Sequence, residues 1–583
     1  MSSVELPVAE TRSSAKSNAE TKAGNLIFHL AWLLPCLIIW VWFFASRFDG
    51  LVLPEAMEAA QAGRQVSEGQ GFTTKVLRPL GLVRVGNLSH YPDLYNAPLY
   101  PLLLGISFNL SKPDDRTAGL VSAALGFLTV LLTYALGARL FDRRAAALAA
   151  VLVALHLGLL RAGLSGLNVT LLAGLVTLGF LCVVGHRGTL SWSLLCGAVC
   201  GLAYLADYDA LVLAIPVLGM LVYSQRSRRA RHASMFVVGL AIVMLPWLAR
   251  NWAVGGNPLA GLRSYAVATQ TASYPQMSIY RVTDSQVGGS LAFVARHKRE
   301  SVRKLLLNLG SFQAALPATL GLCLVALVGL ALFVEVGGQA GNRAKWALVG
   351  GLALLGVKLA AGQPRYELLC ALVGVAAAVG AAAFMAEMQA RRFARRTRLG
   401  ATAGVLAVAV LPLVGAVAAP AGGRTPSQRN LEYLGRALPE DAVVIADQPW
   451  AVAWYANRLA VWMPEAAVPV RAEGEELALA TAADVTKASS MLALQRAGVE
   501  PDALFLSSLL PTYPATERLG RWQLLYELLR RQMEALQAGQ AKGTPWTPPG
   551  WMLAATLPPN DFLLVRAEGD APPRTAEAGG TGR

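Results

Sequence analysis

The residues best placed to do chemistry lie in a polar stretch that directly follows an apolar segment near the N-terminus. Pro54-Glu55 opens a helix-like run over 56–68, and Arg64 follows Glu55 by nine residues. A carboxylate just beyond a membrane helix can act as a general base, and a nearby guanidinium can bind a phosphate. A simpler explanation is that Glu55 stands in the first turn of a helix, where the helix dipole favours acids.

Two further arginines and a tyrosine stand at the ends of apolar segments. Arg250 closes the run Pro-Trp-Leu-Ala-Arg, and Arg365-Tyr366 follows a proline. If a phosphate leaves during the reaction, guanidinium groups at the membrane surface would stabilise the developing negative charge. An arginine at a helix end also often extends to the lipid headgroups, and Tyr366 would fit an aromatic belt. Both interpretations stay open for each residue.

Several loop residues could contact a sugar or a cation. His90 and Asp93, in HYPDLY, could line a sugar site, although a lone histidine in a loop usually has no catalytic role. Asp207 and Asp209 lie where two apolar segments turn, and they could bind a divalent cation or the acceptor. A polar turn explains these aspartates more simply. We therefore expect no cofactor and no metal ligand set, with a divalent cation as the alternative.

The composition indicates which elements must position these residues. Of the 583 residues, 55% are apolar and 15% are charged, and the mean hydropathy is +0.46. Soluble proteins carry about 25% charged residues. The chain thus has more apolar surface than a soluble core could bury, which predicts a multispanning membrane protein and excludes disordered and fibrous classes. The six cysteines lie in or beside apolar runs without a C-x-x-C pair, so neither a disulfide framework nor a zinc site is indicated.

Apolar runs predict about eleven membrane spans in an all-α polytopic protein. The runs are 26–46, 117–138, 145–160, 163–184, 190–206, 210–224, 234–249, 314–336, 346–361, 368–386 and 400–419. Arginine clusters at 139–144, 226–231 and 391–398 alternate with loops of low positive charge. This asymmetry places the N-terminus in the cytoplasm and the C-terminus outside. It also explains the net charge of +15 without nucleic-acid binding.

The chain divides into three predicted parts: a flexible tail (1–25), a membrane domain (26–419) and a small α/β domain (420–583). The membrane domain carries two long outer loops, 47–116 and 250–313. Within them, 97–110 predicts an interfacial or re-entrant helix, and 290–310 predicts a basic amphipathic helix on the membrane or a solvated basic face. In the last part we expect strands at 442–446, 503–506 and 562–565, and helices near 427–437, 449–456, 484–497 and 516–538.

Taken together, three segments resemble the membrane glycosyltransferases of the GT-C class. They are residues 116–144, the run PWLARNW at 246–252 with Gly-Asn-Pro at 256–258, and Pro364-Arg365-Tyr366. More narrowly, their order resembles family 39, the protein mannosyltransferase and aminoarabinose-transferase-like branch. The resemblance covers residues 26 to about 470. It implies many helices, a large first outer loop, a soluble C-terminal domain and a polyprenyl-phosphate sugar as donor.

In that family a catalytic aspartate stands early in the first outer loop, often as an Asp-Glu pair after a proline, with an arginine nine residues later. Here Pro54 and Arg64 match, and Glu55 occupies the position of the aspartate. Asp49 and Glu58 are the fallback candidates. Asn96-Ala97-Pro98 replaces the Lys-Pro pair of the family, so one phosphate-binding cation is missing.

The resemblance implies an inverting transferase in which Glu55 deprotonates an acceptor and the arginines hold the phosphate. The acceptor could be a lipid, a glycan or a protein, and membrane lipids are the other expected partners. The absence of disulfides and the Ala/Gly/Arg-rich composition suggest a bacterial inner membrane with a periplasmic site. The alternative is a catalytically silent GT-C-like binding or assembly subunit, which the Glu-for-Asp change favours. A transporter would need inverted repeats and mid-membrane charges, of which only Lys358 is a candidate.

Overall fold

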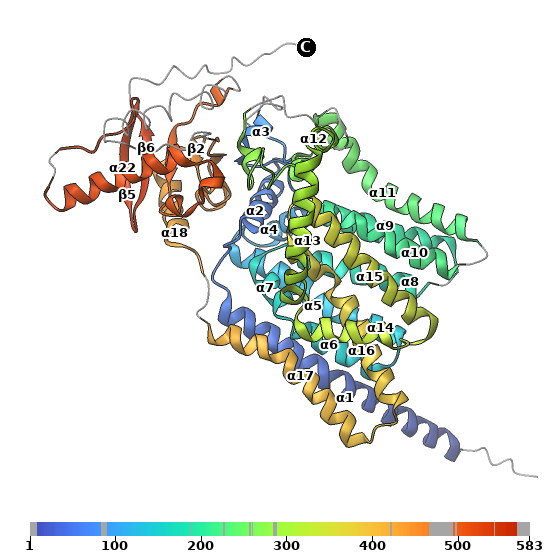
Figure 1. The fold of residues 1–583 in the computed structure, drawn as a ribbon. Coiled ribbons are helices and arrows are strands. Elements are labelled where there is room, and N and C mark those ends of the chain that lie inside the picture. The colour runs from blue at the N-terminus through green and yellow to red at the C-terminus, as the bar shows by residue number, and fades with distance from the viewer. Residues whose placement is uncertain are drawn as a thin grey trace, which may run out of the picture.

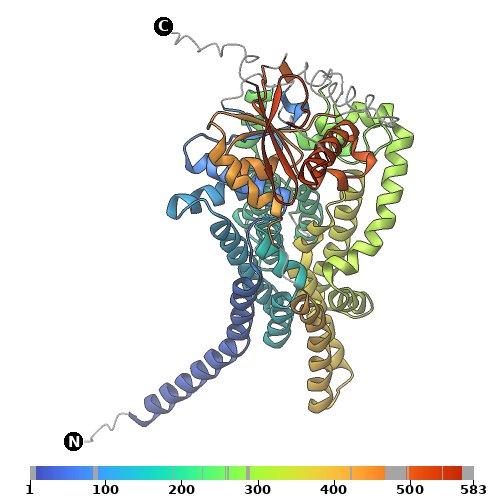
Figure 2. The ribbon, with the colours of Figure 1, turned by 90° about the vertical axis from the view of Figure 1, so that its left-hand side faces the viewer.

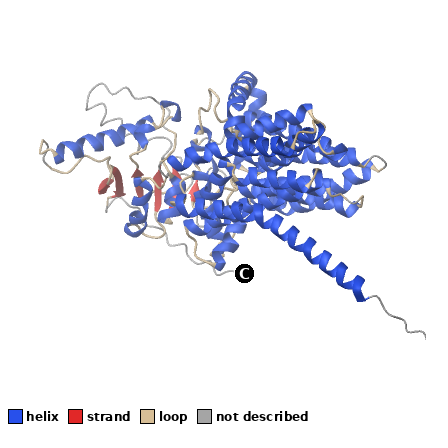
Figure 3. Ribbon diagram, turned by 90° about the horizontal axis from the view of Figure 1, so that it is seen from below, coloured by secondary structure: helices blue, strands red, loops and turns tan. Residues whose placement is uncertain are grey.

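The computed structural model describes residues 8–567 except 83–89, 187, 226–227, 256–257, 259–260, 284–288, 420–422, 466–493, 496–497 and 541–542, and it describes side chains from residue 27 onward. The chain forms a large helical part and a small domain built on a mixed sheet (Figure 1). Seen from below, the strands lie together at one end of the molecule and helices make up the rest (Figure 3). The predicted fold class is confirmed.

Six helices are long and apolar enough to cross a membrane singly, and two bent pairs raise this number to as many as eight within the described residues. The single spans are α1 (Val8–Arg47), α5 (Asp115–Leu140), α11 (Arg229–Gly255), α15 (Gly338–Ala361), η4 (Tyr366–Leu372) with α16 (Val373–Ala390), and α17 (Arg395–Ala418). The bent pairs are α6 (Arg143–Ala154) with α7 (Leu157–Ser165), at 52°, and α13 (Lys298–Leu320) with α14 (Leu322–Phe333), at 106°. Shorter apolar helices are α4 (Leu99–Leu110), α8 (Val169–Val184), α9 (Leu190–Ala206) and η1 (Tyr208–Leu213) with α10 (Ala214–Ser224). The chain is therefore a multi-pass membrane protein, and every predicted span overlaps one of these helices.

Small residues set how closely the membrane helices pack. In α9 and α11, a Cβ atom added to Gly197 would stand 1.9 Å from the carbonyl oxygen of Phe236, and one added to Gly239 would stand 2.0 Å from that of Leu194. Only glycine permits this backbone approach, which is typical of helix pairs in lipid, where packing replaces the hydrophobic effect. The alanine-rich α16 is buried over nearly its whole length and forms the centre of the bundle.

The two long loops and the sheet domain lie at the same end of the bundle, which we call the loop side (Figures 1 and 2). The first loop contains α2 (Pro54–Ser67), β1 (Val76–Leu77), α3 (Pro79–Leu82) and the apolar α4. The second contains η2 (Leu262–Val267), η3 (Ser278–Arg281) and α12 (Ser290–Arg296), which leads into α13. Helix α4 is the predicted interfacial helix, and α2 crosses it closely because both contribute a glycine, Gly63 and Gly105, at the contact.

The sheet has six strands in the order β1-β3-β2-β4-β6-β5. Its elements after residue 420 are α18 (Pro426–Ala437), β2 (Val443–Ala446), α19 (Pro449–Ala451), η5 (Val452–Ala456), β3 (Leu459–Trp462), β4 (Ala503–Leu506), η6 (Leu510–Thr512), η7 (Ala515–Glu517), α22 (Gly520–Gln537), β5 (Trp551–Leu557) and β6 (Asp561–Arg566). The three predicted strands are confirmed, and β3 and β5 were not predicted. The helix expected at 484–497 falls almost wholly outside the described residues.

One edge strand of this sheet comes from the first long loop. Strand β1 pairs in parallel with β3, with Val76 opposite Ala460 and Leu77 opposite Val461. The amide of Ala460 donates to the carbonyl of Lys75 at 2.8 Å, and the Lys75 ammonium donates to the side-chain oxygen of Asn457 at 2.9 Å. The backbone between α2 and α4 is thus fixed by a domain that begins more than 300 residues later in the chain.

Candidate functional site

Helix α2 presents its acidic residues and Arg64 on different faces. Pro54 starts the helix, and Glu55 and Glu58 follow at a spacing that places both on one face. Arg64 stands nine residues after Glu55, and about nine residues at 3.6 per turn make two and a half turns. Arg64 accordingly points the other way, where its guanidinium donates to the Trp454 carbonyl at 2.9 Å and lies 4.0 Å from the Trp454 ring. The structure does not bring Glu55 and Arg64 together.

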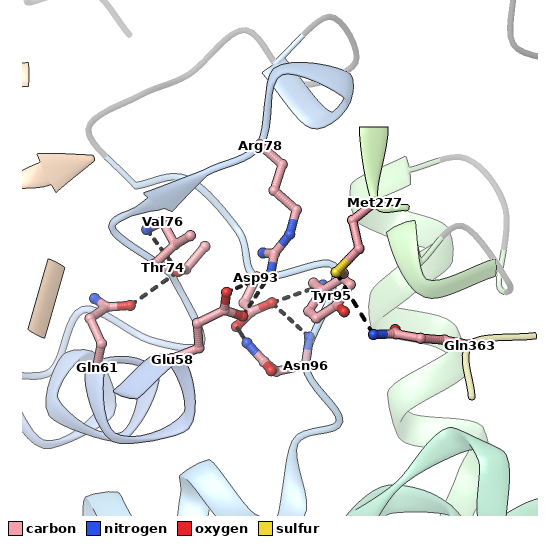
Figure 4. A network of polar contacts seen from close by, with 10 residues as sticks. All are labelled: Glu58, Gln61, Thr74, Val76, Arg78, Asp93, Tyr95, Asn96, Met277 and Gln363. Atoms are coloured by element: carbon pink, nitrogen blue, oxygen red, sulfur yellow. Dashed lines mark hydrogen bonds and ion pairs between the residues drawn. The ribbon is translucent and has the colours of Figure 1, made fainter. Parts of the chain in front are cut away.

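Glu58 forms a buried ion pair with Arg78, the residue that follows β1. The Nη2 atom of Arg78 donates to both carboxylate oxygens of Glu58, at 2.6 and 2.7 Å. Both side chains are buried, and the guanidinium lies 3.6 Å from the centre of the Tyr95 ring (Figure 4). Burial raises the pKa of Glu58, and the positive charge of Arg78 opposes this rise. The carboxylate of Glu58 is therefore held in place by Arg78 and is not free to bind another group.

The carboxylate of Asp93 forms its hydrogen bonds within its own loop. Its carboxylate accepts from the amides of Tyr95 and Asn96 at 2.8 and 2.9 Å and from the Asn96 side chain at 2.8 Å (Figure 4). Arg250 supports the same loop, because its Nη1 atom donates to the Asp93 carbonyl at 3.0 Å and its Nη2 atom to the Phe72 carbonyl at 3.0 Å. His90, by contrast, is exposed. The sugar-binding roles predicted for these residues stay predictions.

The second long loop and the turn before η4 bring two arginines to one aspartate. Arg365 donates to Asp207 at 2.9 Å, and the Nη2 atom of Arg263 lies 3.8 Å from the same carboxylate oxygen. Asp207 is fully buried, and the side chain of Arg263 is largely buried. Burial lowers the pKa of Arg263, but the acidic groups around it, Asp207 foremost, together outweigh this effect and raise it.

Two buried donors of the second long loop form no hydrogen bond within the described residues, although one of them keeps its ion pair with Asp207. They are the Nη2 atom of Arg263 and the hydroxyl of Tyr280. Both side chains contact Tyr95, since Arg263 lies 5.3 Å from its ring and Tyr280 packs edge-on at 5.5 Å. Burial raises the pKa of Tyr95 to about 12, against the nearby positive charges of Arg263 and Arg78. An anionic oxygen placed here would satisfy both unpaired donors.

Glu55 lies on the same face of α2 as Glu58 and carries a free carboxylate. It is half-buried, and it has no hydrogen bond or ion pair within the described part of the chain. Its negative charge contributes to raising the pKa of both Glu58 and Tyr95. Asp49 is instead exposed and lies 3.9 Å from Arg429 of α18. Among the three acidic candidates, Glu55 alone has neither a hydrogen bond nor an ion pair within the described residues.

The remaining predicted residues lie at the membrane end of the cluster. The hydroxyl of Tyr366 donates to the Asn308 carbonyl at 2.5 Å. Asp209 pairs with Lys358 at 3.3 Å, so the unusual intramembrane lysine has a partner at the helix end. Nearby, Gln363 donates to the sulfur of Met277 at 3.8 Å and thereby links the turn before η4 to the second loop (Figure 4). No group of three or more His, Cys, Asp or Glu side chains among the described residues could hold a metal ion.

Sequence reasoning missed four residues of this cluster: Arg78, Tyr95, Arg263 and Tyr280. Arg78 and Arg263 were visible only as arginines in the two long loops. Nothing local marks them, because Arg78 meets Glu58 only after β1 has joined the sheet, and Arg263 meets Asp207 across separate loops.

Comparison with known proteins supports the fold. The family model described as dolichyl-phosphate-mannose-protein mannosyltransferase matches residues 95–249. No curated protein sequence matches the chain. The oligosaccharyltransferase of Archaeoglobus fulgidus, solved with a tethered acceptor peptide, is 13% identical with a TM-score of 0.55, and the match covers 94% of this chain and 75% of that one. AglB from the same organism, solved with an inhibitory peptide and a dolichol-phosphate, is 14% identical with a TM-score of 0.53 and the same coverage.

A third similar structure is ArnT from Cupriavidus metallidurans bound to undecaprenyl phosphate, which is 12% identical with a TM-score of 0.49 over 94% of this chain and 99% of that one. The protein thus has the GT-C-like fold of membrane glycosyltransferases, as its sequence motifs predicted. Within that class, the matched family model spans the chain from α4 to α11.

Proposed function

We propose that this protein is a glycosyltransferase that moves a sugar from a polyprenyl-phosphate donor to a lipid, glycan or protein acceptor. The observation that carries the proposal is the free carboxylate of Glu55 on the loop side, together with two buried donors that form no hydrogen bond within the described residues, the Nη2 atom of Arg263 and the hydroxyl of Tyr280. The GT-C-like fold supports it, as do the matched mannosyltransferase model and the dolichol-phosphate in the similar AglB structure. We place the loop side outside the cytoplasm, at the periplasmic face if the membrane is a bacterial inner membrane, on the arginine distribution of the sequence.

In the proposed reaction, Glu55 accepts the proton of an acceptor hydroxyl or amine as that group attacks the anomeric carbon. The bond between this carbon and the phosphate oxygen breaks, and the configuration at the carbon inverts. Negative charge develops on the leaving phosphate. Arg263 and Tyr280 stabilise this charge, because buried donors that are already in place interact more strongly with it than water does. Glu58 is a poorer base, because taking up a proton would weaken its ion pair with Arg78.

The alternative, a silent binding or assembly subunit, is favoured by one observation. The pairs Glu58–Arg78 and Arg365–Asp207 satisfy most of the charged groups internally, as in a site that no longer turns over. The two proposals differ in whether a donor is cleaved.

The experiment uses the purified full chain, labelled polyprenyl-phosphate sugars and crude membrane acceptors, and it measures release of polyprenyl phosphate. Glu55→Gln is compared with Glu68→Gln, an exposed acid at the far end of α2. Release by the wild type and Glu68→Gln but not by Glu55→Gln supports the transferase and its base. Equal release by all three keeps the transferase and removes Glu55. Neither release nor donor binding, with any sugar, supports the silent subunit.

A further inference from the structure

A second amphipathic site lies between α1 and α5 and continues into a chamber lined by Arg64, on the face of α2 opposite Glu55. Helices α1 and α5 enclose an apolar groove of about 710 Å³. Aromatic side chains, Trp40 and Phe44 of α1 and Phe48 just after it, form one wall, and the small residues Ala123 and Ala124 of α5 form the base. The groove opens toward lipid along two helices that cross the membrane, so its natural occupant is a hydrocarbon chain.

The groove ends at Arg116, in the first turn of α5. This arginine is exposed and has no ion pair or hydrogen bond within the described residues. A lone cation at the polar end of an apolar groove has the charge and position to bind a lipid phosphate. A hydrocarbon chain and a phosphate together specify an amphiphile and not a free anion.

A polar chamber of about 550 Å³ continues from the groove and shares Phe48 and Arg116 with it. Trp454 and Tyr455 of the sheet domain line it, and the Asp115 carboxylate binds both, at 2.6 and 3.0 Å. The chamber also contains the exposed carboxylates of Asp49 and Asp114, together with Arg64 and the Arg424–Glu432 ion pair. Its lining therefore offers acceptors for an ammonium group within the same space that offers Arg116 to a phosphate.

We propose that this site binds one phospholipid with a primary-amine headgroup, whose chain lies in the α1–α5 groove, whose phosphate contacts Arg116 and whose ammonium contacts Asp114. The occupant is distinct from the donor of the transferase reaction, because the chamber is lined by Arg64, which stands on the opposite face of α2 from Glu55. The bound lipid joins α1, α5 and the sheet domain at their common contact. This inference does not depend on the proposed function.

The test is native mass spectrometry of the full chain in detergent, titrated with phosphatidylethanolamine, phosphatidylcholine, phosphatidylglycerol or a polyprenyl phosphate. We expect one phosphatidylethanolamine to bind at least tenfold more tightly than phosphatidylcholine, whose quaternary amine cannot donate a hydrogen bond. Arg116→Ala should weaken binding at least tenfold. Asp114→Asn should remove the preference for the amine, and it keeps the helix cap because asparagine caps as well as aspartate.

Two further variants separate the site from general lipid binding. Ala124→Trp fills the groove and should abolish binding of the retained lipid. Arg343→Ala alters a comparable apolar groove between α10 and α15 and should change nothing. Equal retention by wild type and Arg116→Ala would overturn the proposal. So would loss of polyprenyl-phosphate binding in Ala124→Trp, because the groove would then belong to the donor.

Discussion

Replacement of Arg78 by alanine tests whether the Glu58–Arg78 pair holds the candidate site together. The variant leaves a buried carboxylate whose two hydrogen bonds, at 2.6 and 2.7 Å, are lost. Removing one partner of a buried ion pair costs about 3–5 kcal/mol, most of it from the orphaned charge. A further part comes from the lost contact between the guanidinium and the Tyr95 ring at 3.6 Å, about 0.5–2 kcal/mol. The free energy of unfolding of the loops and sheet should fall by roughly these amounts.

The same variant should acquire a pH dependence. Burial raises the pKa of Glu58, and the loss of Arg78 removes the charge that opposes this rise. A raised folded-state pKa contributes stability below the unfolded value, about 4.3, and this contribution is lost as pH rises through the folded value. The deficit of Arg78→Ala should therefore be smaller at acidic than at alkaline pH. Adding Glu58→Gln should recover part of the stability and remove this pH dependence.

The assay is denaturation in mixed micelles, followed by tryptophan fluorescence at several pH values and compared across the wild type, both single variants and the double variant. A free energy of unfolding for Arg78→Ala within about 1 kcal/mol of the wild-type value at every pH would refute the reasoning, because an unpaired buried carboxylate destabilises a protein by more than that. A coupling energy near zero in the double-mutant cycle would do the same.

Two other predictions follow from contacts outside this pair. Asp115→Ala removes the hydrogen-bond acceptor of Trp454 and Tyr455, so the free energy that holds the sheet domain to the bundle should fall by about 1.5–3 kcal/mol. Limited proteolysis near residue 423 should then be faster. Cleavage at the wild-type rate would show that other contacts hold the domain. Gly239→Ala places a Cβ atom 2.0 Å from the Leu194 carbonyl oxygen and should reduce the yield of folded protein in detergent. The control is Gly219→Ala in α10, whose added Cβ atom meets nothing within 4 Å and should leave the yield unchanged. Equal yields would mean that α9 and α11 can separate with little loss of stability.

The fold could largely be predicted because its signals are local. Apolar runs of membrane length, such as 117–138 and 400–419, predicted α5 and α17, and short buried apolar runs predicted β2 and β6. Strand β1 could not be predicted, since two residues carry no pattern and their pairing with β3 is decided by tertiary structure. Strand β5 alternates weakly, and neither of its faces is fully buried.

The candidate site could be predicted only in part. Glu55 stood out because a proline and a membrane span precede it. The arginine expected to act with it was wrong. Arg64 follows Glu55 by nine residues and seemed close in sequence, but the two side chains lie on opposite faces of the helix. The buried cations of the site, Arg78 after β1 and Arg263 in the second loop, both contact Tyr95, and only the folded chain brings them together.

The measurement that most directly tests the central claim is the single-turnover rate of polyprenyl-phosphate release for Glu55→Gln, with donor binding measured in parallel. The loss of a general base predicts a rate about 10²–10⁴-fold below that of the wild type with donor affinity unchanged. A rate within about tenfold of the wild type would contradict the assignment of Glu55 as the base.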